Sequence, residues 1–304
     1  MFDVIILGSG PAGLTAAIYT GRAELQTLLI AGTTWGGQLM LTREVENFPG
    51  FQEGILGPNL MDNMWKQAAR FGAQMVYDDV TKVDFSTSPL KVRAGKIEYE
   101  AKSIIIATGS SPKWLGVTGE GRLRGKGVSV CAVCDAPFFK EKKVMVVGGG
   151  DSAMEEALAL SKFAREIIVV HRRDEFRACK ALQQRVFKDP KISYIWKSVV
   201  REIKGKDRVE GVVLQRVDTD EESTVMCDAV FVAIGHKPNT EIFTNQLDLD
   251  DQGYIIARAG SKTNVQGVFV AGDVTDRHYR QAIIAAGAGC KAALDVERYL
   301  TASS

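Results

Sequence analysis

Two segments of the chain share one pattern of apolar and polar positions. Each begins with a short apolar run, passes through a glycine-rich turn and continues with apolar residues at helical spacing, over residues 4–19 and 143–163. A short apolar run bounded by glycines is typical of a buried parallel strand, and the spacing after it predicts a helix. The sequence therefore predicts strands at 4–7 and 143–147, helices at 14–19 and 154–163, and an α/β fold with two Rossmann-like dinucleotide-binding domains.

The first glycine turn reads Gly8-Ser9-Gly10-Pro11-Ala12-Gly13. Between a strand and a helix, Gly8 permits the tight turn, Gly10 lets the backbone approach a pyrophosphate, and Gly13 allows close packing of helix and strand. The N-terminus of the helix then faces the anion. The alternative is a glycine-rich turn without a ligand, but the strand–turn–helix context favours a dinucleotide site.

The second turn carries the same pattern with alanine in the last place, Gly148-Gly149-Gly150-Asp151-Ser152-Ala153. One such match is weak evidence for a nucleotide site. Two matches, each with its own strand and helix, predict a chain that binds two dinucleotides.

A basic cluster follows the strand predicted at 166–170. His171 lies 23 residues after Gly148 (171 − 148 = 23), where an NAD site usually has an acidic residue for the ribose 2′-hydroxyl. Arg172, Arg173 and Arg177 stand there instead, and guanidinium groups are suited to bidentate capture of a 2′-phosphate. The second ligand is therefore predicted to be NADP(H), with a solvated basic helix start as the alternative. The matching place after the first turn (8 + 23 = 31) holds alanine, so no residue is predicted for the first ribose.

Cys131 and Cys134 form a Cys-x-x-Cys pair just upstream of the second glycine turn. Two cysteines at this spacing can close a small disulfide at a helix start, where exposed amides lower the pKa of a thiol. Zinc is the alternative, but a structural zinc needs four ligands, usually a second Cys-x-x-Cys or paired histidines. The other three cysteines and the three histidines are isolated in the sequence, so the pair is interpreted as redox-active.

Composition excludes several classes of protein. The 304 residues, 45% hydrophobic and 25% charged, are typical of a globular protein with two domains. A net charge of +1 gives no general attraction to nucleic acid or to an anionic membrane. No apolar run approaches the roughly 20 residues of a membrane span. The chain enters a strand at once, without the pattern of a signal peptide, so a cytoplasmic location is expected.

Taken together, the motifs make the chain resemble the low-molecular-weight, bacterial-type thioredoxin reductases over essentially its whole length. The segments that carry the resemblance, in matching order and spacing, are 8–13, 36–39, 45–50, 107–109, 131–135, 148–153, 171–177, 233–236, 271–274 and 279–283. The resemblance implies FAD at the first turn, NADPH at the second, a homodimer, and thioredoxin or a thioredoxin-like protein as the partner.

The resemblance also implies which residues contact each cofactor. Those for FAD are Gly8, Gly10, Pro11, Ala12, Gly13, Gly37, Gln38, Asn47, Ala107, Thr108, Gly109, Gly272, Asp273, Arg280, Gln281 and Ala282. Those for NADPH are Gly148, Gly150, Asp151, Ser152, Ala153, His171, Arg172, Arg173 and Arg177. In the first set, the family places Asn47 close to the isoalloxazine, Asp273 on the ribityl chain, and residues 280–283 over the flavin.

The predicted reaction passes electrons from NADPH to FAD, then to the Cys131–Cys134 disulfide, and then by dithiol–disulfide exchange to a protein. By resemblance, Cys134 faces the flavin, Cys131 attacks the partner disulfide, and Asp135 protonates the leaving thiolate. A simple cap of the following helical turn is the alternative for Asp135. Val133 between the cysteines and Ala136 after the aspartate depart from the usual family pattern and bear on which partner docks.

The strand predicted at 267–273 resembles the second FAD-contacting motif of the family, so the FAD domain is expected to be discontinuous. Residues 1–112 and 240–304 are assigned to it, and residues 113–239 to an inserted NADPH domain with the cysteine pair. The crossovers lie near Pro112 and Pro238, because proline disfavours helix continuation. Residues 119–127 are interpreted as a surface loop. Because the cysteine pair and the nicotinamide site share the inserted domain, they reach one flavin alternately only if that domain turns.

Three rival functions are compatible with parts of this pattern. A flavin dithiol oxidase and a ferredoxin-fed reductase are both expected to lack the turn at 148–153 and the arginine cluster, which this chain has. A non-catalytic redox sensor that keeps FAD as a structural ligand is disfavoured by the combination of cysteine pair, acid and NADPH site.

Overall fold

The chain separates into two compact units in the computed structural model, which describes residues 1–42 and 44–302. The first unit comprises Met1–Ser111 and Lys237–Ser304, and the second comprises Pro112–His236. Both crossovers run through one two-stranded ribbon, formed by β9 (Ser110–Pro112) and β18 (His236–Pro238). The predicted boundaries at 112 and 239 lie at this ribbon or one residue beyond it.

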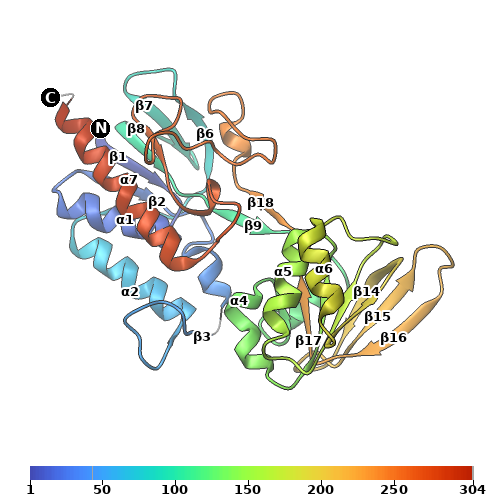
Figure 1. The fold of residues 1–304 in the computed structure, drawn as a ribbon. Helices are drawn as coiled ribbons and strands as arrows, with labels where there is room; N and C mark the ends of the chain where they lie inside the picture. The colour runs from blue at the N-terminus through green and yellow to red at the C-terminus, as the bar shows by residue number, and fades with distance from the viewer. Residues whose placement is uncertain (43, 303–304) are drawn as a thin grey trace. The chain divides into compact units, whose positions relative to one another are not determined.

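The first unit is built on a seven-stranded sheet (Figure 1). Its strands, in spatial order, are β5 (Gln74–Val76), β2 (Thr27–Ile30), β1 (Phe2–Leu7), β8 (Ile97–Ile106), β7 (Leu90–Ala94) and β6 (Val80–Asp84), with β19 (Val268–Val270) also paired to β8. The pairs among β5, β2, β1, β8 and β19 are parallel, and β6 and β7 are antiparallel. Since β19 returns to this sheet after the second unit, the second unit is an insertion, which confirms the predicted fold class.

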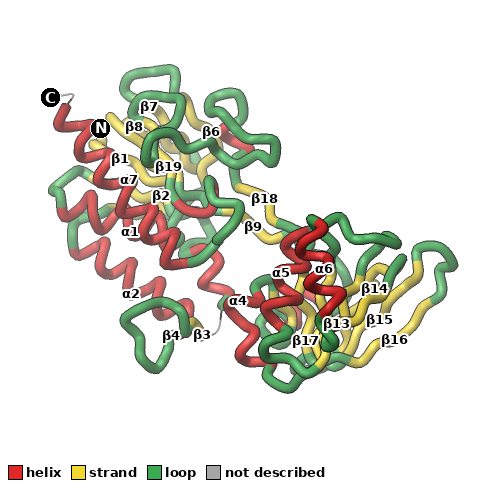
Figure 2. Tube along the Cα trace, viewed as in Figure 1, coloured by secondary structure: helices red, strands yellow, loops and turns green. Residues whose placement is uncertain are grey.

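Helices cover one face of this sheet (Figure 2). They are α1 (Pro11–Arg22), α2 (Gly57–Arg70) and α7 (Ala282–Ala302). Val4 and Ile6 of β1 pack in the core beneath these helices, whereas Ile5 and Leu7 pack in a second core on the opposite face. Successive side chains of a strand point to opposite faces, so two covered faces require the unbroken apolar run seen in the sequence. The shorter elements of this unit are η1 (Gly37–Leu41), β3 (Glu44–Val45), β4 (Ile55–Leu56), η3 (Glu241–Phe243) and η4 (Gly272–Val274).

The second unit repeats the architecture around a five-stranded parallel sheet. Its strands, in spatial order, are β10 (Val128–Ser129), β17 (Ala229–Val232), β11 (Lys143–Val147), β12 (Glu166–Val170) and β13 (Ile192–Ile195). An antiparallel sheet follows, of β14 (Ser198–Lys204), β15 (Gly211–Arg216) and β16 (Glu222–Met226). The helical elements are α3 (Glu120–Leu123), α4 (Ala132–Asp135), η2 (Ala136–Phe139), α5 (Asp151–Leu160) and α6 (Lys180–Lys188).

The core of the second unit explains its layers. Val144 and Val146 of β11 pack in one cluster with residues of α5, and Met145 and Val147 pack in another with residues of β14 and β15. The central sheet therefore lies between helices on one face and the antiparallel sheet on the other. Both predicted strand–turn–helix units are confirmed, although each helix begins three residues earlier than expected, within its glycine turn and directly after Gly10 or Gly150.

The interpretation of residues 119–127 as a surface loop is wrong for residues 120–123. The segment contains α3, and both Glu120 and Leu123 are buried. The Glu120 carboxylate accepts hydrogen bonds from the backbone N–H groups of Leu115 at 2.8 Å and Gly116 at 2.9 Å. Backbone donors compensate the burial of this charge, which a reading of the segment by composition does not detect.

Candidate functional site

The first glycine turn joins β1 to α1. Gly8 has a φ of +104°, and a Cβ there would lie 2.4 Å from the carbonyl oxygen of Ala107. A Cβ at Gly13 would lie 1.8 Å from the carbonyl oxygen of Gly8, so helix and turn pack more closely than a side chain allows. At Gly10, in contrast, a Cβ would meet nothing within 4 Å, and Gly10 is the N-cap of α1 without a side-chain hydrogen bond. The turn thus leaves room for an anion beside the N-terminus of α1, as a dinucleotide pyrophosphate requires.

A carboxylate lies beside the end of β2, although position 31 itself is alanine. Asp79, between β5 and β6, accepts hydrogen bonds from the backbone N–H and the hydroxyl of Thr33, both at 2.9 Å. A Cβ at Gly32 would lie 3.1 Å from Asp79 Oδ1. The spacing rule missed this residue because it is 46 positions beyond Thr33 and reaches the turn only through the pairing of β2 with β5.

The other residues predicted for FAD lie in four further segments of the first unit, at 37–38, 47, 107–109 and 272–282. Two of these segments meet directly, because Asn47 Nδ2 donates a hydrogen bond to Gln281 Oε1 at 3.3 Å across 234 positions of sequence. Thr108 faces the crossover instead. Its hydroxyl donates to the carbonyl oxygen of Asn239, and Asn239 Nδ2 donates to the carbonyl oxygen of Thr108, both at 2.8 Å.

Asp273 lies in η4, which packs directly against the first glycine turn. A Cβ at Gly272 would lie 2.9 Å from the Cβ of Ala12. Burial, together with the neighbouring carboxylate of Asp276, raises the pKa of the Asp273 carboxyl to about 6, and Arg280 acts in the opposite direction. A carboxyl that is partly protonated near neutral pH both donates and accepts hydrogen bonds, which suits a ligand rich in hydroxyl groups.

The second glycine turn, between β11 and α5, has the same construction. A Cβ at Gly148 would lie 2.3 Å from the carbonyl oxygen of Ala233, and one at Gly149 would lie 2.4 Å from the ring of His171. A Cβ at Gly150 would meet nothing within 4 Å, and Gly150 is the N-cap of α5 without a side-chain hydrogen bond. This turn therefore also fits a pyrophosphate.

The arginine cluster is attached to the second glycine turn by its backbone. The carbonyl oxygen of Gly149 accepts hydrogen bonds from the N–H groups of Arg177 at 2.7 Å and Ala178 at 3.2 Å. The side chains of Arg172, Arg173 and Arg177 are exposed, and none forms an ion pair with a residue that the structure describes. Three guanidinium groups beside a pyrophosphate turn suit a ligand with an additional phosphate.

His171 differs from the arginines that follow it. Its imidazole is 5% exposed and contacts the rings of Phe176 and Trp196. Burial lowers the pKa of this imidazole, and the charges of the neighbouring arginines lower it further. The side chain is therefore neutral, and its ring packs directly against the backbone of Gly149. Asp151 has a similar local role, because its carboxylate accepts the N–H of Cys179 at 2.7 Å, at the start of α6.

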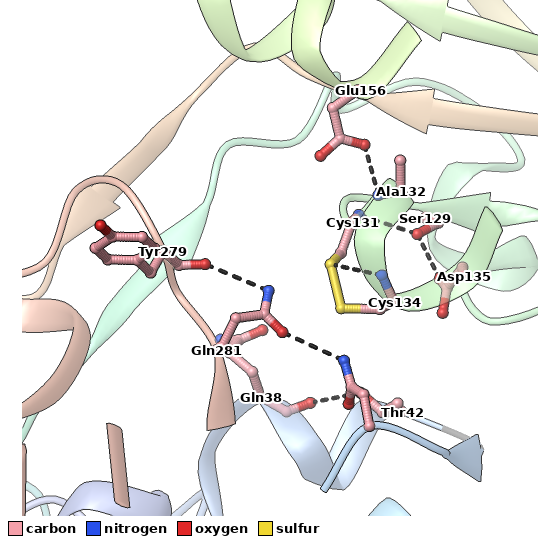
Figure 3. The surroundings of a disulfide bond; sticks show 11 residues. Gln38, Thr42, Ser129, Cys131, Ala132, Cys134, Asp135, Glu156, Tyr279 and Gln281 are labelled. Atoms are coloured by element: carbon pink, nitrogen blue, oxygen red, sulfur yellow. Dashed lines mark hydrogen bonds between the residues drawn. A yellow bond between two sulfur atoms is a disulfide. The ribbon is translucent and has the colours of Figure 1, made fainter. Parts of the chain in front are cut away.

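The two cysteines of the Cys-x-x-Cys pair form a disulfide in the second unit (Figure 3). Cys131 is the N-cap of α4, and Cys134 lies within the same helical turn, with the two Cα atoms 5.3 Å apart. The N–H of Cys134 donates to Cys131 Sγ at 3.2 Å. This geometry confirms the predicted disulfide at a helix start and places a backbone donor where a thiolate forms on reduction.

Asp135 is held by a serine that the sequence motifs did not indicate. Ser129 Oγ donates to Asp135 Oδ2 at 2.5 Å and accepts the N–H of Cys131 at 3.1 Å. Burial raises the pKa of the Asp135 carboxyl, and the Ser129 hydrogen bond partly offsets this effect. Asp135 occupies the N-cap position of η2, as the alternative expected, but its side chain makes no capping hydrogen bond there. The carboxyl is instead joined through one hydroxyl to the backbone of a redox cysteine.

Glu156 is a second residue of this site that sequence reasoning missed. Its carboxylate, on α5, accepts the N–H of Ala132 at 2.6 Å (Figure 3). Ser129 precedes the cysteine pair and Glu156 follows the second glycine turn, and neither position belongs to a recognised spacing rule. Only the packing of α4 against α5 brings Glu156 to the disulfide turn.

The remaining cysteines lie outside this site. Cys179 is exposed and Cys290 is partly exposed, whereas Cys227 is buried and burial raises the pKa of its thiol to about 12. Over residues 1–42 and 44–302, no three His, Cys, Asp or Glu side chains cluster in a way that could hold a metal ion. In the same part of the chain, no helix has the length and apolar character needed to span a bilayer.

A profile of the pyridine nucleotide-disulphide oxidoreductases matches residues 2–289. The thioredoxin reductase of Rickettsia felis is 56% identical to this chain over 302 residues, which cover 98% of this chain and 97% of that protein. The sequence similarity therefore extends through both units and the disulfide turn.

Solved structures of thioredoxin reductases are also similar to this chain over almost its whole length. The thioredoxin reductase from Streptococcus pyogenes covers 99% of this chain and 99% of its own, at 40% identity and a TM-score of 0.95. The Lactococcus lactis thioredoxin reductase in its FR conformation has the same identity and covers 99% of this chain and 100% of its own, but its TM-score is 0.68. Two relatives equally similar in sequence thus differ in overall structure.

Proposed function

Because the chain belongs to the pyridine nucleotide-disulphide oxidoreductase family, we propose that it is a thioredoxin reductase, which transfers electrons from NADPH through FAD and the Cys131–Cys134 disulfide to thioredoxin or a thioredoxin-like protein. The observation that carries the proposal is the disulfide of α4, which lies in the unit that also holds the second glycine turn and the exposed arginines. That unit therefore combines an electron source and an electron carrier.

FAD is assigned to the first unit and NADPH to the second. The room at Gly10 and at Gly150 supports both assignments, since in each turn a dinucleotide would occupy the space that a side chain would fill. When bound, the two cofactors supply the hydride and electron transfer that reduces the disulfide. The roles of the individual cofactor-binding residues follow the sets given above and are part of the proposal.

Disulfide exchange is the step that the chain's own residues perform. The reduced Cys131 thiolate attacks the partner disulfide, forming a mixed disulfide and releasing one partner thiolate. Cys134 then attacks Cys131 Sγ, which restores the Cys131–Cys134 disulfide and releases the partner as a dithiol. Two electrons pass from the cysteine pair to the partner, and the two released thiolates take up two protons.

Asp135 is proposed to supply one of those protons. Its raised pKa keeps the carboxyl protonated at higher pH than an exposed aspartate. The Ser129 hydroxyl holds the carboxyl beside the redox turn, because it bonds to both Asp135 and the N–H of Cys131. The carboxyl is thus positioned as a general acid for a leaving thiolate.

Selectivity for NADPH is assigned to Arg172, Arg173 and Arg177. Their guanidinium groups are exposed and lie on a segment bonded to Gly149. A 2′-phosphate would gain charge-assisted hydrogen bonds that NADH cannot offer.

Asp79 is proposed to take the place of the missing acidic residue at the FAD ribose. Both of its carboxylate oxygens already accept one hydrogen bond from Thr33. A carboxylate has about four acceptor sites in total, so further sites remain for ribose hydroxyls. Asp79 lies beside Gly32, at the end of the strand where such a ribose is usually held.

The partner is proposed to dock over the apolar side chains that flank the cysteines. Val133 is 66% exposed and Phe138 is 46% exposed. A compact protein with a disulfide at its own surface, as in a thioredoxin-like fold, would cover such a patch while its sulfur approaches Cys131. A cytoplasmic homodimer is proposed from family resemblance and is tested by light scattering of the purified protein.

We infer that the second unit turns during the reaction cycle. The polypeptide passes between the units at two places, both in the β9–β18 ribbon, and such paired crossovers suit a hinge. The two relatives of equal identity but different TM-score support such freedom in this fold. Crystals of the holoprotein should show either Cys134 or the nicotinamide pocket against the flavin. One crystal form with both in contact would refute the rotation.

A steady-state assay with NADPH, FAD-loaded protein and the thioredoxins of the same organism tests the whole proposal. We expect NADPH-dependent formation of thioredoxin thiols, and slow oxygen consumption when thioredoxin is left out. Rapid NADPH-independent reduction of oxygen by small dithiols, with no thioredoxin turnover, would instead identify a dithiol oxidase.

A further inference from the structure

Glu156 connects the redox turn to α5. Its carboxylate accepts the N–H of Ala132, the first residue of α4, at 2.6 Å, a distance typical of a charge-assisted hydrogen bond. We propose that Glu156 is a positioning residue for disulfide exchange, which anchors the redox turn and lowers the reduction potential of the cysteine pair. The potential falls because the negative charge of Glu156 favours the thiol over the thiolate in the reduced pair. The inference rests on the proposed function, because it concerns how the Cys131–Cys134 couple delivers electrons.

The anchoring follows from which atoms accept the first backbone N–H groups of the redox turn. The N–H of Cys131 goes to Ser129 Oγ and that of Cys134 goes to Cys131 Sγ, both within the segment around the disulfide. The N–H of Ala132 alone goes to a charged side chain from another element. Since α5 begins within the second glycine turn, directly after Gly150, the redox turn and the nucleotide turn are attached to the same helix.

The electrostatic effect follows from the position of the carboxylate, which accepts the N–H of Ala132, the residue directly after Cys131. A nearby negative charge disfavours a second negative charge, so it raises the pKa of a thiol. The hydrogen bond from the Cys134 N–H to Cys131 Sγ has the opposite effect, since it stabilises a thiolate. A reduced form that is less stabilised makes a couple a stronger reductant. Glu156 thus opposes the stabilisation of the thiolate by the turn and makes the cysteine pair a better electron donor.

The test uses the FAD-loaded protein and a dithiothreitol redox buffer at pH 7, without NADPH and without air. Dithiothreitol loses two electrons and two protons as it closes to its cyclic disulfide, and the Cys131–Cys134 disulfide gains the two electrons. One proton goes to Cys134, and the second goes to Cys131 or to the buffer, according to the pKa of the Cys131 thiol. The fraction reduced is read by alkylation and mass spectrometry. In Glu156→Gln, which keeps an acceptor oxygen for the Ala132 N–H, we expect the equilibrium to move on the order of tenfold toward the dithiol, or about 30 mV.

Two further variants separate charge from geometry. Glu156→Asp keeps the charge and should retain a potential closer to that of the unmodified protein than Glu156→Gln does. Glu222→Gln, on β16, removes one exposed carboxylate from the same unit and should change nothing. The rate of iodoacetamide alkylation, measured against pH, should have a midpoint about one unit lower in Glu156→Gln.

A Glu156→Gln protein with the potential and alkylation midpoint of the unmodified protein would overturn the proposal, even if its melting temperature fell. An equal shift in Glu222→Gln would overturn it as well. Neither measurement involves NADPH or thioredoxin. A failure of NADPH-dependent thioredoxin reduction in the unmodified protein would therefore refute the proposed function and leave these two results to be judged separately.

Discussion

The N–H of Arg177 donates to the carbonyl oxygen of Gly149 at 2.7 Å. The bond joins the basic cluster to the middle of the second glycine turn, although the two are 28 positions apart (177 − 149 = 28). A dinucleotide whose pyrophosphate lies at the turn would therefore have its adenosine ribose near the guanidinium groups. The residues proposed for NADPH selectivity and those proposed for the pyrophosphate are therefore joined by this hydrogen bond.

Replacing Arg172 and Arg173 together by alanine should weaken NADPH binding by several kcal/mol, since each charge-assisted hydrogen bond contributes roughly 1.5–3 kcal/mol. The KM for NADPH should rise at least about a hundredfold while use of NADH changes little. Steady-state kinetics with both nucleotides measure this. Arg208→Ala, an exposed arginine of the same unit, is the control. Equal use of NADH and NADPH by the unmodified protein would contradict the assignment.

Cys131→Ser and Cys134→Ser should each abolish thioredoxin reduction, because exchange to a free dithiol product needs both thiols. Bleaching of the flavin by NADPH should persist in stopped-flow measurements, since it does not involve the cysteines. Cys290→Ser should retain both activities. Thioredoxin turnover by Cys131→Ser would rule out its role as the attacking thiol.

The pH dependence of exchange should report Asp135. Burial raises the pKa of this carboxyl, so the proton is present at low pH and is lost as pH rises through the raised pKa. The exchange rate with thioredoxin should therefore fall on the alkaline side. Asp135→Asn should lower the rate about 10²- to 10⁴-fold and remove that alkaline limb.

In a Ser129 variant, the direction in which the pH profile moves separates the proposed hydrogen bond from a purely structural role. The Ser129 hydrogen bond lowers the pKa of Asp135, so Ser129→Ala should move the alkaline limb to higher pH. Ser193→Ala, on β13, should leave the profile unchanged. A limb that moves to lower pH, or stays in place, would contradict the assigned hydrogen bond.

Asp79→Asn should weaken FAD binding by about 1 kcal/mol, or roughly fivefold, because an amide accepts a weaker hydrogen bond than a carboxylate. Release of FAD, followed by the rise in flavin fluorescence on dilution, measures this without any assay of activity. Asp78→Asn is the neighbouring control. Unchanged FAD release in Asp79→Asn would mean that another group contacts the ribose.

Local patterns determined much of this protein. The apolar run and glycine spacing around Gly8 and Gly148 specify a strand, a tight turn and a helix, because each of those preferences acts over a few residues. The Cys131–Cys134 disulfide also follows from a spacing of three at a helix start. Composition was a poorer guide. It predicted a surface loop at 119–127, where Glu120 is buried and satisfied by backbone donors.

Only the tertiary structure decided which distant groups complete each site. Asp79 meets Thr33 across 46 positions through strand pairing, and Glu156 meets Ala132 across 24 positions through helix packing. His171 is a neutral, buried ring packed against Gly149, a position that its place at the start of a basic cluster does not indicate. The sequence by itself determined the two nucleotide turns and the redox pair, since their spacing is short. The groups that tune them come from other elements, and their positions depend on how whole strands and helices pack.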